Sequence, residues 1–197
     1  MGHREQLLDL FQQQNGLVLT RDLEKAGIPR HYLTLLLRQG LIERANHGVY
    51  VTPEAFEDEL YALQARNRHI IFSHETALYL HDLTDRDPIS WTVTVPSGYN
   101  GQYLSEKGIQ VYSIKKELHL LGVAEAETPF GRPIRIYNPE RTLCDMVRNR
   151  STMDSALTHD AMKRYLSSKD KNIPLLLRYA EQLRIASLIR QHVEILL

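Results

Sequence analysis

The sequence predicts an α+β protein with two regions of mixed helix and strand and a helical tail. Three observations indicate this class. Hydrophobic spacing changes from helical to alternating within residues 28–52, alternation typical of strands returns from Trp91, and helical spacing continues from Asn138 to the end. The expected organisation is a small N-terminal domain over residues 1–52, a helical bridge over residues 53–90 and an α+β C-terminal domain over residues 91–197.

Composition limits the class of protein. The 197 residues include 24 Lys and Arg and 24 Asp and Glu, so any affinity for nucleic acid must come from a local positive patch. The single cysteine, Cys144, cannot form an intramolecular disulfide, which favours a reducing compartment. No apolar run approaches membrane-spanning length, and the first residues have no signal-peptide core. We therefore expect a soluble, cytoplasmic protein with no membrane partner.

The first two helices are predicted from apolar spacing and end signals. The segment REQLLDLFQQQNG places its leucines and Phe11 on one face, and the Asn-Gly pair ends it as a helix stop. After the short extended segment LVL, Thr20 is expected to act as the N-cap of a second helix. Gly27 ends this helix after about two turns, a length consistent with a helix-turn-helix.

A third helix and a hairpin follow. Pro29 is expected at the first position of this helix, where its missing N–H is not needed. Leu33, Leu36 and Leu37 recur at the spacing of a core-facing stripe, and Gly40 closes the helix. The segment LIERANHGVYV is typical of strand, turn and strand. The residues expected to pack back from this hairpin are Leu41, Val49 and Val51.

The order helix, strand, helix, helix, hairpin is that of a winged helix-turn-helix. In such a domain the third helix lies in the DNA major groove, and the hairpin turn, the wing, reaches the neighbouring backbone or minor groove. The candidate contacts are Arg30, His31, Thr34 and Arg38 on the helix and Arg44, Asn46 and His47 in the wing. Two alternatives remain: these residues form an ordinary solvated surface, or the domain is a protein-interaction module. Leu35 is apolar on this polar face and suits either a thymine methyl group or a protein partner.

The bridge is predicted to be helical. Pro53 starts a helix in which Phe56, Leu60 and Leu63 sit at helical spacing. A second helix, SHETALYLHDL, begins at Ser73 and ends in TDRDP.

Strands and then helices fill the rest of the chain. WTVTV and IQVYSI alternate cleanly, LHLLGVAEAET is less regular, and IRIYN follows an FGRP turn. Asn138 is expected as an N-cap with Pro139 at the first helical position. Arg141 and Asp145 are four residues apart and can pair along that helix. The last segments are predicted to be helical to the end.

No combination of residues indicates catalysis or metal binding. His69, His74 and His81 lie close together, but they lack the i, i+4 spacing of helical metal ligands, and half-exposed histidines are the simpler interpretation. Cys144 lies in an apolar helical stretch and is expected to be buried packing. Glu140 is explained by the dipole at a helix N-terminus. We therefore expect no catalytic residue, metal or cofactor, and no enzymatic activity.

The segments LTRDLEKAGIPRHYLTLLLRQGLIERANHGVYV, FSHETALYLHDLTDRDP, TVTVP and YNPERTLCDMVR resemble the AbiEi family of antitoxins from bacterial type IV toxin–antitoxin and abortive-infection (phage defence) systems. This resemblance implies a transcriptional repressor that binds operator DNA at its own promoter through its N-terminal domain. It also implies a C-terminal domain that counters a nucleotidyltransferase-like toxin. Transferred by position, the DNA-contacting residues are Arg21, Arg30, His31, Tyr32, Thr34, Leu35, Arg38, Arg44, Asn46 and His47.

The expected assembly follows from operator symmetry. Because operator half-sites usually mirror protein symmetry, one winged helix per chain suggests two copies, either as a homodimer or as cooperative binding on DNA. Two alternatives to a DNA-binding antitoxin stay open. In the first alternative the chain is a module that only docks a protein partner. In the second it is a stand-alone regulator that senses a small ligand.

Overall fold

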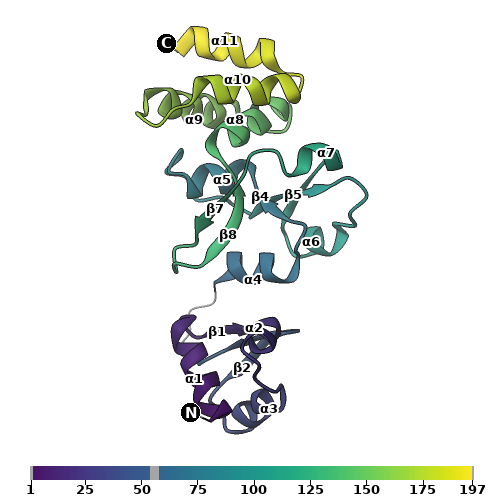
Figure 1. Ribbon diagram of the computed structural model, residues 1–197. Helices are drawn as coiled ribbons and strands as arrows, with labels where there is room; N and C mark the ends of the chain where they lie inside the picture. Colours follow the sequence, from purple (N-terminus) through teal and green to yellow (C-terminus); the bar gives the residue numbers. More distant parts are fainter. Residues whose placement is uncertain (1, 54–57, 197) are drawn as a thin grey trace. The chain divides into compact units, whose positions relative to one another are not determined.

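The computed structural model describes residues 2–53 and 58–196, and it contains two compact units (Figure 1). The first unit comprises residues 1–67 and 127–133, and the second comprises residues 68–126 and 134–197. The division therefore lies between residues 67 and 68, inside the segment expected as a bridge, and a short later segment belongs to the first unit. Both units contain helices and strands, so the α+β class is confirmed.

Six elements of the first unit follow the order expected from the sequence. They are α1 (His3–Gln13), β1 (Leu17–Leu19), α2 (Thr20–Lys25), α3 (His31–Arg38), β2 (Glu43–Asn46) and β3 (Val49–Val51). The strands form an antiparallel sheet in the order β1-β3-β2, in which Leu17 pairs with Val51 and Leu19 with Val49. The helix α4 (Glu59–Arg66) completes the unit.

The core of the first unit combines apolar side chains of α1, α2 and α3 with Val18 of β1 and Ile42. Leu33 and Leu36 are buried as predicted, and Leu37 packs partly against the same cluster. The prediction for Leu41 was wrong: its side chain is 41% exposed, whereas Ile42 is 1% exposed. The cause is the end of α3, where Gly40 adopts a φ of 66° and the Leu41 N–H donates to Leu36. This reversal turns Leu41 outward and directs the next side chain into the core.

The prediction that Thr20 is an N-cap was wrong by one residue. Leu19 is the N-cap of α2, and its backbone N–H donates to the Asp22 carboxylate at 3.0 Å. Thr20 is the first helical residue, and its backbone N–H donates to the Gly48 carbonyl at 3.0 Å. The hairpin turn between β2 and β3 is thereby attached to the start of α2.

Two predicted helix starts also lie too early. Pro29 precedes α3 by two residues, and its carbonyl accepts a hydrogen bond from the Tyr32 N–H within the turn that leads into the helix. α4 begins at Glu59, because the Asp58 side chain caps it by accepting from the Tyr61 N–H. Phe56, which was assigned to the same helix, lies outside the described residues.

A five-stranded mixed sheet organises the second unit. Its order is β6 (Gln110–Ile114), β5 (Thr92–Pro96), β4 (Ile71–Phe72), β8 (Pro133–Tyr137) and β7 (Val123–Glu127). The central strand β4 runs antiparallel to β5 and parallel to β8. The sequence did not reveal β4, since two residues are too few to show alternation. The same unit contains the short helices α5 (His74–Leu80), α6 (Gln102–Glu106) and α7 (Lys116–His119).

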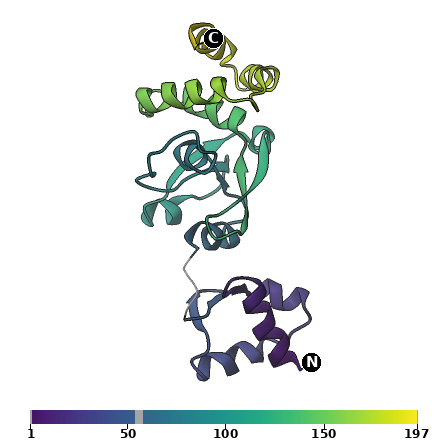
Figure 2. The same cartoon turned by 90° about the vertical axis from the view of Figure 1, so that its left-hand side faces the viewer.

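The predicted helical tail is present. It consists of α8 (Pro139–Arg148), α9 (Ser155–Ser167), α10 (Ile173–Gln182) and α11 (Ala186–Leu196). These helices lie together on one side of the sheet in both views (Figures 1 and 2), and their apolar faces supply most of an extensive buried cluster. The Asn138 side chain caps α8 by accepting from the Arg141 N–H, and Pro139 is its first residue, as predicted. No described helix combines the length and apolar character needed to cross a bilayer.

Candidate nucleic-acid interface

The exposed side of α3 brings four of the predicted contacts together. His31, Thr34, Leu35 and Arg38 follow the i, i+3, i+4, i+7 spacing of one helix face, and all four are exposed. We call these four residues the α3 face. Leu35 is 38% exposed, so an apolar side chain lies within a polar and positively charged surface.

Arg30 precedes this helix and has a partner on α2. It is the N-cap residue of α3, its side chain is 68% exposed, and its guanidinium forms an ion pair with Glu24. A pair this exposed contributes little to stability, so the guanidinium remains available to exchange the carboxylate for a phosphate.

Tyr32, another predicted contact, lies off the α3 face. Its side chain is half-buried and packs against the core of the first unit. The rings of His31 and Tyr32 lie 4.2 Å apart between centroids at a tilt of 34°. The Tyr32 ring therefore packs against the His31 ring.

The hairpin turn carries a second positively charged group. Arg44 Nη2 donates to His47 Nδ1 at 2.9 Å, and both residues are exposed. Gly48 adopts a φ of 72°, a conformation that glycine reaches without steric cost. The side chain of Asn46, another predicted contact, lies outside the described residues. Arg21 directly follows Thr20, whose N–H donates to the carbonyl of Gly48 in this turn. The Arg21 Nε lies 4.0 Å from the Asp22 carboxylate.

Arg38 differs from Arg21 and Arg30 in its surroundings. In the described ranges, it lies within 4.0 Å of no carboxylate, whereas Arg21 and Arg30 each have one nearby. Arginine recognises guanine and phosphate through the same fork of N–H donors. The α3 face therefore combines one available guanidinium with hydroxyl, imidazole and apolar groups, the kinds of group that can contact base edges.

Away from the α3 face, a buried ion pair joins parts of the first unit that are distant in sequence. Arg132 Nη1 lies 3.4 Å from the Asp58 carboxylate, and the two side chains are 6% and 1% exposed. Arg132 Nη2 also donates to the carbonyls of Gln14 and Asn15, both at 2.9 Å. The Thr128 hydroxyl donates to Asp58 at 2.6 Å. These contacts connect residues 127–133 to the end of α1 and the start of α4, and no sequence pattern indicated them.

Residues 5–53 match the model of a family described as a transcriptional regulator, AbiEi antitoxin. Residues 5–53 belong to the AbiEi family. The resemblance noted from the sequence is thereby confirmed for the segment that contains α3 and the hairpin. The AbiEi description is that of a regulator and antitoxin, and it includes no catalytic activity.

One solved structure shows a similar fold. The crystal structure of the RV2827C protein from Mycobacterium tuberculosis aligns with a TM-score of 0.58 at 15% sequence identity. The alignment covers 91% of this chain and 71% of that chain. At this identity the likeness shows the fold alone. No curated protein matches this chain by sequence.

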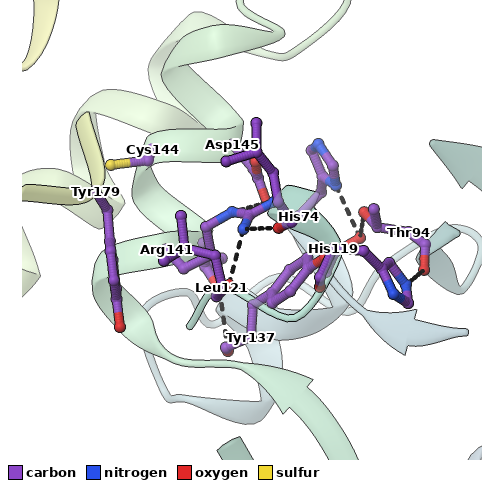
Figure 3. Close-up of polar contacts among 12 residues, drawn as sticks. His74, Thr94, His119, Leu121, Tyr137, Arg141, Cys144, Asp145 and Tyr179 are labelled. Atoms are coloured by element: carbon purple, nitrogen blue, oxygen red, sulfur yellow. Dashed lines mark hydrogen bonds and ion pairs between the residues drawn. The ribbon is translucent and has the colours of Figure 1, made fainter. Parts of the chain in front are cut away.

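Outside the AbiEi segment, the second unit contains a buried polar cluster around Arg141 (Figure 3). The predicted pair with Asp145 is present at 3.0 Å, and both side chains are buried. Arg141 Nη1 also donates to the carbonyls of Leu118 and Leu121, at 2.9 and 2.8 Å, and the guanidinium lies 4.1 Å above the Tyr137 ring. Burial raises the pKa of Asp145, and the adjacent guanidinium opposes that shift. The cluster anchors the loop before β7 to α8.

His74 is buried, contrary to the expectation of a half-exposed helix histidine. It adopts a φ of 49°, and its ring stacks on Tyr112 at 3.7 Å between centroids. The Asn149 amide donates to its Nε2 at 2.8 Å, which leaves Nδ1 to donate to the Ser73 hydroxyl at 2.9 Å. Burial, assisted by the charge of Arg141, lowers the pKa of His74 to about 3. The ring is therefore neutral at physiological pH.

The other expectations about reactive residues concern Cys144 and the histidines. Cys144 is fully buried, as predicted, and burial raises the pKa of its thiol. The His81 ring hydrogen-bonds the Tyr137 carbonyl at 2.7 Å, so it has a structural partner. A search of the described residues finds no group of three side chains placed to hold a metal ion.

Acidification from about pH 6 to about pH 4 is expected to destabilise the second unit. In the unfolded chain His74 titrates near its usual pKa of about 6.5, whereas the folded pKa is about 3. Between these values the unfolded state binds one more proton, so the free energy of unfolding falls by up to about 1.4 kcal/mol per pH unit as pH decreases. Urea titrations followed by the fluorescence of Trp91, the sole tryptophan, measure this slope.

His74→Asn is the matched variant for this measurement. Asparagine tolerates a positive φ and does not titrate, so the variant should lose the His74 contribution to this slope. The carboxylates and the other histidines with lowered pKa values, His81, His119 and His192, contribute equally in both proteins. Identical slopes in the wild type and the variant would show that His74 is not the group responsible.

Proposed function

We propose that this protein is an antitoxin and transcriptional autorepressor of a type IV toxin–antitoxin operon. Its first unit would act as a winged helix that binds operator DNA, and its second unit would counter a nucleotidyltransferase-like toxin in the cytoplasm. The observation that carries the proposal is the exposed α3 face, which lies within the segment that belongs to the AbiEi family. The attachment of the hairpin turn to α2 supports a role for that turn as the wing.

In the proposed complex, α3 occupies the major groove. Arg38 contacts a guanine edge or a phosphate, and Leu35 contacts a thymine methyl group. Arg44 and His47 contact the backbone or minor groove beside it. Because the whole chain has no net charge, affinity rests on these local cations and falls steeply with salt. Two copies act together on the operator, as a homodimer or by cooperative binding.

One observation favours a second candidate function. Leu35 is the apolar member of the α3 face, and an apolar group on an exposed helix also suits a protein partner. Under this alternative the chain only docks a partner protein, and it binds its own upstream DNA no better than scrambled DNA.

Arg38→Ala is expected to weaken binding to the upstream DNA of the protein's own gene by about 1–3 kcal/mol, or roughly 5- to 150-fold. Arg30→Ala should have a smaller effect, because that guanidinium must first leave Glu24. Fluorescence anisotropy with labelled upstream DNA and scrambled DNA, at several salt concentrations, measures both affinity and its salt dependence.

Arg4→Ala is the matched control, since Arg4 is an exposed arginine on α1 and lies outside the α3 face. It should bind as the wild type does. Equal affinity of the wild type for upstream and scrambled DNA at low salt would reject the repressor proposal. Specific binding that survives Arg38→Ala unchanged would instead mean that another surface contacts DNA.

A further inference from the structure

The second unit contains a pocket in which three cations from separate segments meet. Its volume is about 250 Å³, and it is lined by Lys115, Arg148 and Arg184 together with Glu117 and Gln182. Lys115 lies between β6 and α7, Arg148 is the last residue of α8, and Arg184 lies in the turn between α10 and α11. These five residues belong to one compact unit, and we call their pocket the three-cation pocket.

The positive charge of this pocket exceeds its negative charge. Within residues 2–53 and 58–196, none of the three cations lies within 4.0 Å of a carboxylate, and Glu117 is the single acidic side chain that lines the pocket. The carboxyl ends of α8 and α10 add about half a negative charge each. The three cations, offset by the Glu117 carboxylate and the two helix ends, leave the pocket with about one net positive charge.

The backbone of Arg184 provides an independent indication. The turn after α10 is a Schellman motif, in which the Ile185 N–H donates to Ala180 and the Arg184 N–H donates to Glu181. In this motif the residue after the C-cap has a positive φ and is usually glycine. Here that residue is Arg184, with a φ of 60°. The helix dipole favours a cation near the carboxyl end of α10. A cation in the last turn of the helix would satisfy the dipole without the backbone strain of a positive φ. Strained residues of this kind cluster at functional sites.

We propose that the three-cation pocket binds a phosphate monoester group. Guanidinium forks match the oxygens of a phosphate, and two arginines and one lysine line this pocket. The Gln182 amide is a neutral donor beside them. The volume holds a phosphate and part of its ester and is smaller than the usual range for whole drug-sized ligands. This site is independent of the α3 face and of the proposed function.

Isothermal titration of the full chain tests the proposal with probes of graded chemistry. Inorganic phosphate and AMP should bind, whereas adenosine should not, and a 5′-phosphorylated oligonucleotide distinguishes a nucleic-acid end from a free metabolite. Because the α3 face is itself proposed to bind DNA, the oligonucleotide affinity counted for this pocket is the part that is lost when the same oligonucleotide carries no 5′-phosphate. Tighter binding of AMP than of the oligonucleotide identifies a small phosphate ester, and the reverse order identifies a strand end. Equal binding of AMP and adenosine, or binding of an acidic peptide but not of phosphate, would overturn the proposal.

Arg184→Gly is the decisive variant, since glycine fits the left-handed turn and removes the cation. It should weaken phosphate binding at least about tenfold while the midpoint of thermal unfolding stays equal or rises. Arg148→Gln is a second variant whose effect does not depend on that turn. The control is Arg190→Ala, which removes an exposed arginine on α11 that is paired with Glu181. Phosphate binding that persists in both pocket variants would refute the site.

Discussion

Arg141→Leu is expected to lower the free energy of unfolding of the second unit by about 3–5 kcal/mol. The guanidinium is fully buried and supports three acceptors at once, the Asp145 carboxylate and the carbonyls of Leu118 and Leu121. Leucine fills part of the same volume but leaves a carboxylate and two carbonyls buried without those donors. Each unsatisfied group retains its desolvation cost, so the loss exceeds that of an ordinary ion pair.

A double variant separates the charge from the carbonyl contacts. Arg141→Leu with Asp145→Leu removes both charges and should recover part of the lost stability, since only the two carbonyls then lack a donor. Arg190→Ala is the control, because it breaks an exposed pair and should cost less than about 1 kcal/mol. Urea unfolding followed by Trp91 fluorescence measures all three. A change below about 1 kcal/mol for Arg141→Leu would show that the cluster is not a major stabilising contact.

Local patterns predicted the elements whose causes are local. The spacing of Leu33 and Leu36 depends on three or four neighbouring residues, and so does the Asn138 cap. The same holds for the presence of the Arg141 pair. Its burial was not predictable, because the two carbonyls that accept from the guanidinium lie 23 and 20 positions earlier in the sequence. The orientation of Leu41 failed for a related reason, since one left-handed residue changes which side chain enters the core.

The candidate interface shows the same limit. The spacing of α3 residues was sufficient to place His31, Thr34 and Arg38 on one exposed face. Spacing was not sufficient to predict the position of Tyr32, because packing against the core of the first unit determines where its partly buried ring lies. The pairing of Arg30 with Glu24 likewise depends on how the turn between α2 and α3 closes. Strand β4 was not predictable from the sequence, because its pairing with β5 and β8 defines it and its own two residues show no pattern.

Arg132→Met is expected to destabilise the first unit by about 3–5 kcal/mol, although Arg132 lies outside the proposed interface. Asp58 would remain buried without its guanidinium, and the carbonyls of Gln14 and Asn15 would lose their donor. Because those carbonyls follow α1, which packs on α3, the loss should reach the α3 face. Hydrogen exchange of the amides in α1 and α3 measures the local stability directly.

The expected consequence for function is weaker DNA binding with an unchanged salt dependence. Arg132 supplies no phosphate contact, so the number of released counterions should stay the same while the population of competent first units falls. Arg38→Ala should instead reduce the salt slope if it contacts a phosphate, and Arg4→Met serves as the exposed control. The same reasoning applies to a fragment of residues 1–52, which lacks both Asp58 and Arg132 and should bind less tightly than the full chain. Wild-type exchange rates and affinity in Arg132→Met would show that the buried pair stabilises only residues 127–133.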